Sequence, residues 1–287
     1  MESSDARPYT RTVVRRPLRI VSVVALAFGC AAPPVPPYVP PDPVTRTYVI
    51  STMDVDGDYL ATPPRAHGLD LDGMVGGDPA LPCTGGMDYA SMIDGAPGVD
   101  NEAGPAFAAI GSTLGPDGLD GLLRTEIQSG RSLVLEVSGI DDLVEDSSVE
   151  VRLWVVAAPP RGPEFDGPGL APGQTFRRTT DLGGGPGLIV GGRLHGGEWT
   201  VPIAFDFQGR RIVLLVHDAR ITGDVSDGDG VALGELGGVL LVDEVTAMWM
   251  CTVCGPESDI SPQADGRRCD GFSVGIGFTA VPALLTE

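Results

Sequence analysis

The sequence predicts a mostly β fold, a β-sandwich of jelly-roll type with two or three short flanking helices. Three observations lead to this expectation. Many short segments are rich in valine and bounded by glycine or proline, the clearest of them alternate apolar and polar residues, and helical periodicity is confined to three places. Short strands separated by turn signals, with few helices, are typical of a sandwich.

The expected strands follow one another along most of the chain. They cover Val44–Met53, Ser132–Ser138, Val149–Ala157, Gln174–Thr180, Gly187–His195, Glu198–Phe207, Arg211–Val216 with a continuation through Ala219–Val225, Val231–Leu241 and Phe272–Ala280. Alternation is clearest in the third, where every second residue is valine or leucine and one face is therefore buried. In the last strand the outer face carries only Ser273, Gly275 and Gly277. Such small residues suit the close approach of another strand.

Helices are expected at Ala103–Ser112, Asp117–Gln128 and Val242–Met250. The second is the best defined, because Asp117 or Asp120 can cap it, leucines and Ile127 form an apolar stripe, and Gly130 ends it. We expect these stripes to pack on the core.

The N-terminal segment predicts export. Residues 1–29 hold five arginines against two acids, followed by an apolar stretch from Ile20 to Phe28. This stretch is shorter than the roughly 20 apolar residues of a membrane-spanning helix and fits the apolar region of a signal peptide. Residues 1–29 are therefore expected to be removed, and Arg15-Arg16 leaves a twin-arginine route open.

Ala27-Phe28-Gly29-Cys30 resembles the lipobox of bacterial lipoproteins, with Ala27 and Phe28 standing where leucine and a small residue are usual. The resemblance implies that Cys30 is lipidated and becomes the new N-terminus. It also implies sorting to the outer membrane, where one exists, because Ala31 rather than aspartate follows. Ordinary cleavage after Ala31 or Ala32 is the alternative.

Residues 30–43 form a linker with seven prolines. Such a polyproline tract is extended and holds a folded body away from a surface. The body, residues 44–287, is expected to be a single β-rich domain with an Asp/Gly-rich segment at 54–101.

The other four cysteines support the lipoprotein interpretation. Cys83, Cys251, Cys254 and Cys269 are an even number and would form two disulfides in an oxidising compartment, in any of three pairings. The Cys251–Cys254 spacing is also that of redox pairs and of half a zinc site. It follows an apolar segment and precedes Gly255-Pro256 rather than opening a helix after a strand, so we favour structural disulfides.

The charge of the chain argues against binding to nucleic acid or directly to an anionic membrane surface. The net charge is −20, and without residues 1–29 it is −23. A protein this acidic repels nucleic acid and anionic membrane surfaces. The expected partners are therefore a membrane reached through the lipid anchor, and an envelope protein or a glycan. Lysine is absent, and asparagine occurs once, at Asn101, which makes that residue worth attention.

The Asp/Gly-rich segment contains the candidate metal ligands. In extended backbone Asp70 and Asp72 project to one side, and Asp100 and Asn101 follow later in the same segment. Neighbouring carboxylates repel one another unless a cation bridges them, and calcium takes 6–8 oxygen ligands of this kind. Aspartate beside glycine is also common turn chemistry, and Asp224–Gly230 is fully explained as a turn.

No catalytic residues are predicted. Gly271-Phe-Ser273-Val-Gly275 matches the pattern of a serine nucleophile, but no histidine follows it in the chain, and the segment alternates as a strand. The histidines are scattered, at positions 67, 195 and 217. A glycan-active sandwich would use paired carboxylates, for which the strand glutamates at 136, 150 and 198 are the candidates, beside an aromatic platform from Trp154 or Trp199.

The Gly68–Gly73 stretch, the later Gly98–Asn101 and the strand Cys269–Ala280 are similar to uncharacterised exported bacterial lipoproteins. That resemblance covers most of the body and implies no activity. The sequence thus predicts a lipid-anchored cell-envelope protein, a structural or ligand-binding module stabilised by calcium. The alternative is a secreted glycan-active hydrolase or carbohydrate-binding protein.

Overall fold

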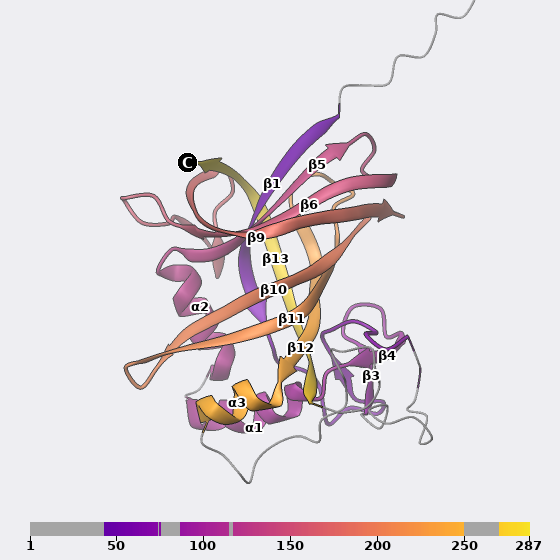
Figure 1. Cartoon of the computed structure of the whole chain (residues 1–287), viewed down its shortest axis with the longest axis vertical. Coiled ribbons are helices and arrows are strands. Elements are labelled where there is room, and N and C mark those ends of the chain that lie inside the picture. The colour runs from indigo at the N-terminus through magenta and orange to yellow at the C-terminus, as the bar shows by residue number, and fades with distance from the viewer. Residues whose placement is uncertain (1–42, 74, 76–86, 115–116, 250–269) are drawn as a thin grey trace, which may run out of the picture. The chain divides into compact units, whose positions relative to one another are not determined.

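The structure, a computed structural model, describes residues 43–73, 75, 87–114, 117–249 and 270–287 (Figure 1). All of them belong to the unit Pro40–Glu287. Cys30 and the other four cysteines, together with residues 1–29, predicted to be a signal peptide, and nearly all of residues 30–43, lie outside the described residues.

Eight long strands form a closed barrel rather than the expected sandwich. They are β1 (Val44–Asp54), β5 (Arg131–Ile140), β6 (Glu145–Ala157), β9 (Gln174–Val190), β10 (Arg193–Phe207), β11 (Arg210–Asp224), β12 (Val231–Leu241) and β13 (Gly271–Thr286). From β5 to β13 each strand pairs with the next long strand, and β1 closes the barrel between β13 and β5 (Figure 1). The prediction of a jelly-roll sandwich was wrong.

The reason for that error is physical. Alternating apolar residues show that a strand has one buried face, but a sandwich and a barrel both bury one face of every strand. What separates them here is the pairing of the last strand with the first, for example Val49 with Val281 and Met53 with Phe278. Register shifts occur in both pairings of β1, with β13 and with β5. The periodicity of a single strand predicts neither these shifts nor the closure of the barrel.

The barrel interior is filled by side chains, as expected for eight strands. Its core includes Tyr48, Leu135, Leu153, Phe205 and Phe272. A second, smaller cluster lies on the other face of β1, β5 and β6, where Val49, Val134 and Val156 pack under Leu170 and Phe176. The last residues of β13 also pair in parallel with the start of β9.

Three helices accompany the barrel, at almost the predicted positions. They are α1 (Ala103–Leu114), α2 (Gly118–Gln128) and α3 (Val242–Trp249). In α2 the predicted stripe is buried at Leu119, Leu123 and Ile127 and packs on β1, β5 and β10. Among the described helices, none is long and apolar enough to cross a membrane.

The short strands belong to two small sheets that the sequence did not predict. One contains β2 (Arg65–Ala66), β3 (Asp88–Ser91) and β4 (Pro97–Asp100), and the other contains β7 (Phe165–Asp166) and β8 (Gly169–Leu170). The first sheet matters most here, because it positions the acidic loop that follows β2. The loop Asp224–Gly230 connects β11 and β12 as a turn, as predicted, with Asp224 and Asp227 accepting backbone N–H groups two residues on.

Candidate functional site

Three of the four predicted metal ligands lie together. One oxygen each of Asp70, Asp72 and Asp100 falls within 4.8 Å of the others. Asp100, at the end of β4, is buried, whereas Asp70 and Asp72 are exposed on the loop after β2. The group therefore has a fixed inner carboxylate and two outer ones that face solvent.

Hydrogen bonds from the loop backbone fix this arrangement. The Asp100 carboxylate accepts the N–H groups of Leu71 at 2.6 Å and Asp72 at 3.2 Å. Asp70 accepts the N–H of Gly73 at 2.6 Å, and the Asp100 N–H donates to the Leu69 carbonyl at 3.1 Å. Residues 69–73 are thus bound to β4, and three carboxylates are held close together in one place.

Asn101, the fourth predicted ligand, is fully buried beside this loop. Its side-chain nitrogen donates to the carbonyl of His67 at 2.9 Å and to that of Gly275 at 3.4 Å. Its side-chain oxygen has no hydrogen-bond partner among the described residues. The observed contacts of the amide therefore join the segment before the loop to β13.

That segment, residues 66–69, is called the strap below. It crosses β12 and β13 where both strands carry glycine. A Cβ at Gly275 would overlap the His67 carbonyl, and one at Gly277 would lie 2.6 Å from the His67 ring. A Cβ at Gly237 would lie 3.0 Å from the Leu69 side chain. The sequence predicted that another strand would approach Gly275 and Gly277 closely; the close approach is observed, but the approaching residues 67–68 are not part of a strand.

The ring of His67, a strap residue, lies between two carboxylates. Its Nε2 is 3.7 Å from Asp54 and its Nδ1 is 3.9 Å from Glu235, a carboxylate that is 4% exposed. Burial alone would lower the pKa of His67, but Asp54 and Glu235 outweigh it and raise that pKa to about 9. The imidazole is therefore positively charged at neutral pH and compensates a buried negative charge.

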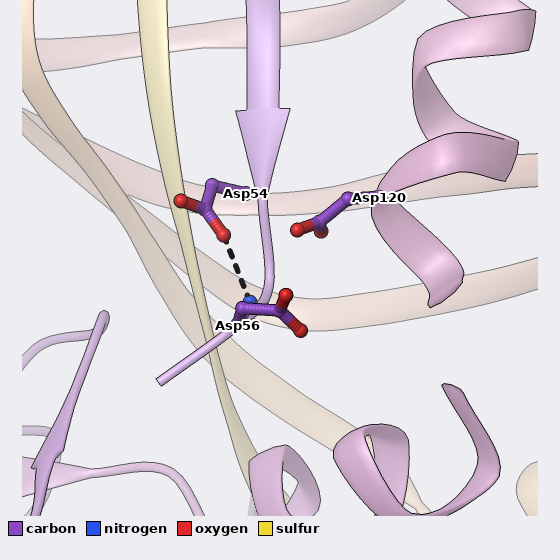
Figure 2. Close-up of side chains that lie close together, drawn as sticks. All are labelled: Asp54, Asp56 and Asp120. Carbon is purple, nitrogen blue, oxygen red and sulfur yellow. Dashed lines mark hydrogen bonds between the residues drawn. The ribbon is translucent and has the colours of Figure 1, made fainter. Parts of the chain in front are cut away.

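A second acidic group adjoins His67. Asp54 at the end of β1, Asp56 just after it and Asp120 in α2 each place one oxygen within 4.8 Å of the others. Figure 2 shows the Asp54 and Asp120 carboxylates facing one another, with Asp54 accepting the Asp56 N–H at 2.9 Å. Asp120 accepts the N–H of Val55 at 2.8 Å. Of the two expected caps, Asp117 is the N-cap residue of α2 but makes no side-chain cap hydrogen bond, and the side chain of Asp120 bridges from the helix to the residue that follows β1.

The two facing carboxylates have opposite pKa shifts. Burial, and then the negative charges of Asp54 and Asp56, raise the pKa of Asp120 to about 7, although the Val55 N–H acts against them. The imidazolium of His67 holds the pKa of Asp54 below its ordinary value. This group can therefore hold a proton at neutral pH, as well as a hard cation. No local spacing predicts this group, because 66 positions separate Asp54 from Asp120.

The two tryptophans proposed for a glycan site lie in different surroundings. Trp199 is buried in the barrel core. Trp154 donates to Glu136 at 2.9 Å, and its ring lies 4.6 Å from the Arg178 guanidinium and 5.7 Å from that of Arg152.

Two of the three strand carboxylates are paired with arginine. Glu136 pairs with Arg178 at 2.9 Å and Glu150 with Arg152 at 3.3 Å. Glu198 lies on β10, and β9 separates this strand from β6, which carries Glu150. Ser273 is buried, and its hydroxyl accepts the Glu102 N–H at 2.9 Å.

No family model, no curated protein and no solved structure matches this chain. The functional argument therefore depends on the chain's own geometry.

Proposed function

We propose that this chain is a lipid-anchored module of the bacterial cell envelope, that it is structural or ligand-binding rather than catalytic, and that calcium stabilises its folded body. The convergence of Asp70, Asp72 and Asp100 is the observation that carries the proposal. In this proposal Cys30 bears the lipid and residues 30–43 form the spacer between the membrane and the barrel.

Calcium suits this loop for three reasons. Carboxylates and carbonyls are its preferred ligands, and two exposed aspartates leave room for the waters that complete 6–8 oxygens. Without a cation, three carboxylates repel one another. A bound cation would join the loop to the buried Asp100 and so to β4 and Asn101. We propose Asp70, Asp72 and Asp100 as the ligands, because one oxygen of each lies within 4.8 Å of the others.

The glycan alternative is less well supported by the contacts. A sugar platform needs an accessible aromatic face, whereas Trp199 is in the core and two guanidinium groups lie close to the ring of Trp154. Two of the three candidate carboxylates are neutralised by arginine. These contacts account for the residues as parts of the barrel wall.

Thermal denaturation tests the role of calcium. We expect the melting temperature of the protein in EDTA to rise by about 5–10 °C when calcium is added in large excess over its dissociation constant. The double variant Asp70→Asn/Asp72→Asn should lose this rise. Asp117→Asn, an exposed aspartate outside both acidic groups, should keep it. An unchanged melting curve for the parent protein would contradict the proposal.

Membrane fractionation tests the anchor. Because the lipid would be attached through the Cys30 thiol, we expect Cys30→Ser to leave the protein out of the lipidated membrane fraction. An Ala31→Ser variant retains the cysteine and should fractionate like the parent. A Cys30→Ser protein that is processed and remains in the membrane to the same extent would rule out lipidation at this residue.

A further inference from the structure

A groove of about 540 Å³ crosses strands β9, β10 and β11. Its apolar lining includes Pro186 and Leu188 of β9, Ile221 of β11 and Leu69 of the strap. This volume lies within the range of small-molecule sites, which are mostly apolar with a few polar groups. The groove is separate from both acidic groups, none of whose carboxylates line it.

One cation lies in this lining. Arg220 is exposed and makes no ion pair with any carboxylate of the described chain. Its side chain passes over Gly197, where a Cβ would lie 2.8 Å from its Cγ. Glu198 also lines the groove but does not pair with Arg220. In a chain of net charge −20, an arginine without an acidic partner is a local site of positive potential.

Two further polar side chains in the groove lining are available to a ligand, those of Thr222 and His195. Thr222 is 5% exposed, and its hydroxyl has no hydrogen-bond partner within the described part of the chain. Buried hydroxyls are rarely left unpaired. His195 also lines the groove, and burial followed by the charge of Arg193 lowers the pKa of its imidazole. His195 is therefore neutral at pH 7 and offers a hydrogen bond rather than a charge.

We propose that the groove binds an amphipathic anion, with its apolar body along Leu69, Pro186 and Leu188 and its anionic group at Arg220. An anionic group beside Arg220 makes a charge-assisted hydrogen bond. Because the strap supplies Leu69, its position on β12 and β13 sets the width of the groove.

The test uses the full chain and two fluorescent probes of similar apolar shape, 8-anilinonaphthalene-1-sulfonate and the uncharged N-phenyl-1-naphthylamine. We expect one saturable site for the sulfonate. Arg220→Gln should weaken sulfonate binding by about tenfold and leave binding of the uncharged probe unchanged. Arg210→Gln, on the same strand and outside the groove, is the matched control. Leu188→Gln should weaken both probes.

Equal sulfonate affinity in Arg220→Gln and the parent protein would overturn the proposal, as would an equal loss for both probes. Light scattering tests whether the protein self-associates without the sulfonate. Self-association that Leu188→Gln abolishes would show that the groove binds a second copy of the chain, and this result would also overturn the proposal. Both probes are titrated at one fixed calcium concentration, and calcium binding is measured in a separate experiment. A failure here is therefore distinguishable from a failure of calcium binding.

Discussion

At the scale of single residues, His67 does most to organise the candidate region. Its backbone carbonyl accepts from Asn101, and its ring lies between Asp54 and Glu235. In a chain without lysine, this imidazolium compensates a glutamate that is 4% exposed. Leaving such a carboxylate without a counter-charge is strongly unfavourable.

The pH dependence of stability tests this role. The folded pKa of about 9 is above the ordinary value of 6.5, so the stabilisation is fully present below pH 6.5 and is lost as pH rises through 9. We expect His67→Gln to lower the free energy of unfolding by about 3 kcal/mol at pH 6, and this deficit to shrink towards pH 10. Urea denaturation at several pH values measures it.

His195→Gln is the control for this experiment, because that histidine lies outside the strap and has a lowered pKa. The loss in free energy of unfolding caused by His195→Gln should not decline in the same way between pH 6.5 and 10. A His67→Gln deficit that is constant across this range would show that the ring acts by packing rather than by charge.

Some of these residues could be identified from the sequence and others could not. Asn101 was noticed because it is the only asparagine, and Asp70, Asp72 and Asp100 because strand geometry and aspartate density place them in one segment. Asp120 and Glu235 join their partners only through tertiary packing. Residues on different elements have no local spacing that would reveal the contact.

At the scale of elements, local patterns were informative. The strand β12 and the starts of β1 and α1 were predicted to the residue, and α2 to within one residue. The hairpin between β9 and β10 was misplaced, because the expected strand Gly187–His195 runs across the observed turn at Gly191-Gly192. Both glycines have positive φ, 58° and 79°, and the apolar residues 188–190 before them had favoured a continuous strand.

The strap depends on glycines that are otherwise ordinary strand residues. Because a Cβ at position 275 would overlap the His67 carbonyl, Gly275→Ala must displace the strap. We expect a loss of about 1–3 kcal/mol in the free energy of unfolding. Amide hydrogen exchange should increase at residues 66–69 and remain slow in the β12–β13 ladder.

Gly185→Ala in β9 is the matched control for this substitution, since its Cβ would have only one neighbour, at 3.4 Å. It should change neither stability nor exchange in the strap by a comparable amount. Unchanged strap exchange in Gly275→Ala would mean that the strap is not held against β13 in solution.

At the scale of the whole molecule, the barrel explains why function has to lie on its wall or its edges. The interior is occupied by Tyr48, Phe205, Phe272 and their neighbours, so the acidic loop, the strap and the groove all lie outside it. The sandwich prediction failed only in how the strands close, since closure depends on pairing β1 with β13 across more than 200 residues. The composition and periodicity behind the prediction remain correct.

The central claim is that one calcium ion binds at Asp70, Asp72 and Asp100. Isothermal titration of the calcium-free chain tests it most directly, because it counts sites and separates the two acidic groups. We predict one site in the parent protein, its loss in Asp70→Asn/Asp72→Asn and its retention in Asp120→Asn, which alters the other group. No heat of binding in the parent protein, or loss of the site in Asp120→Asn alone, would contradict the claim.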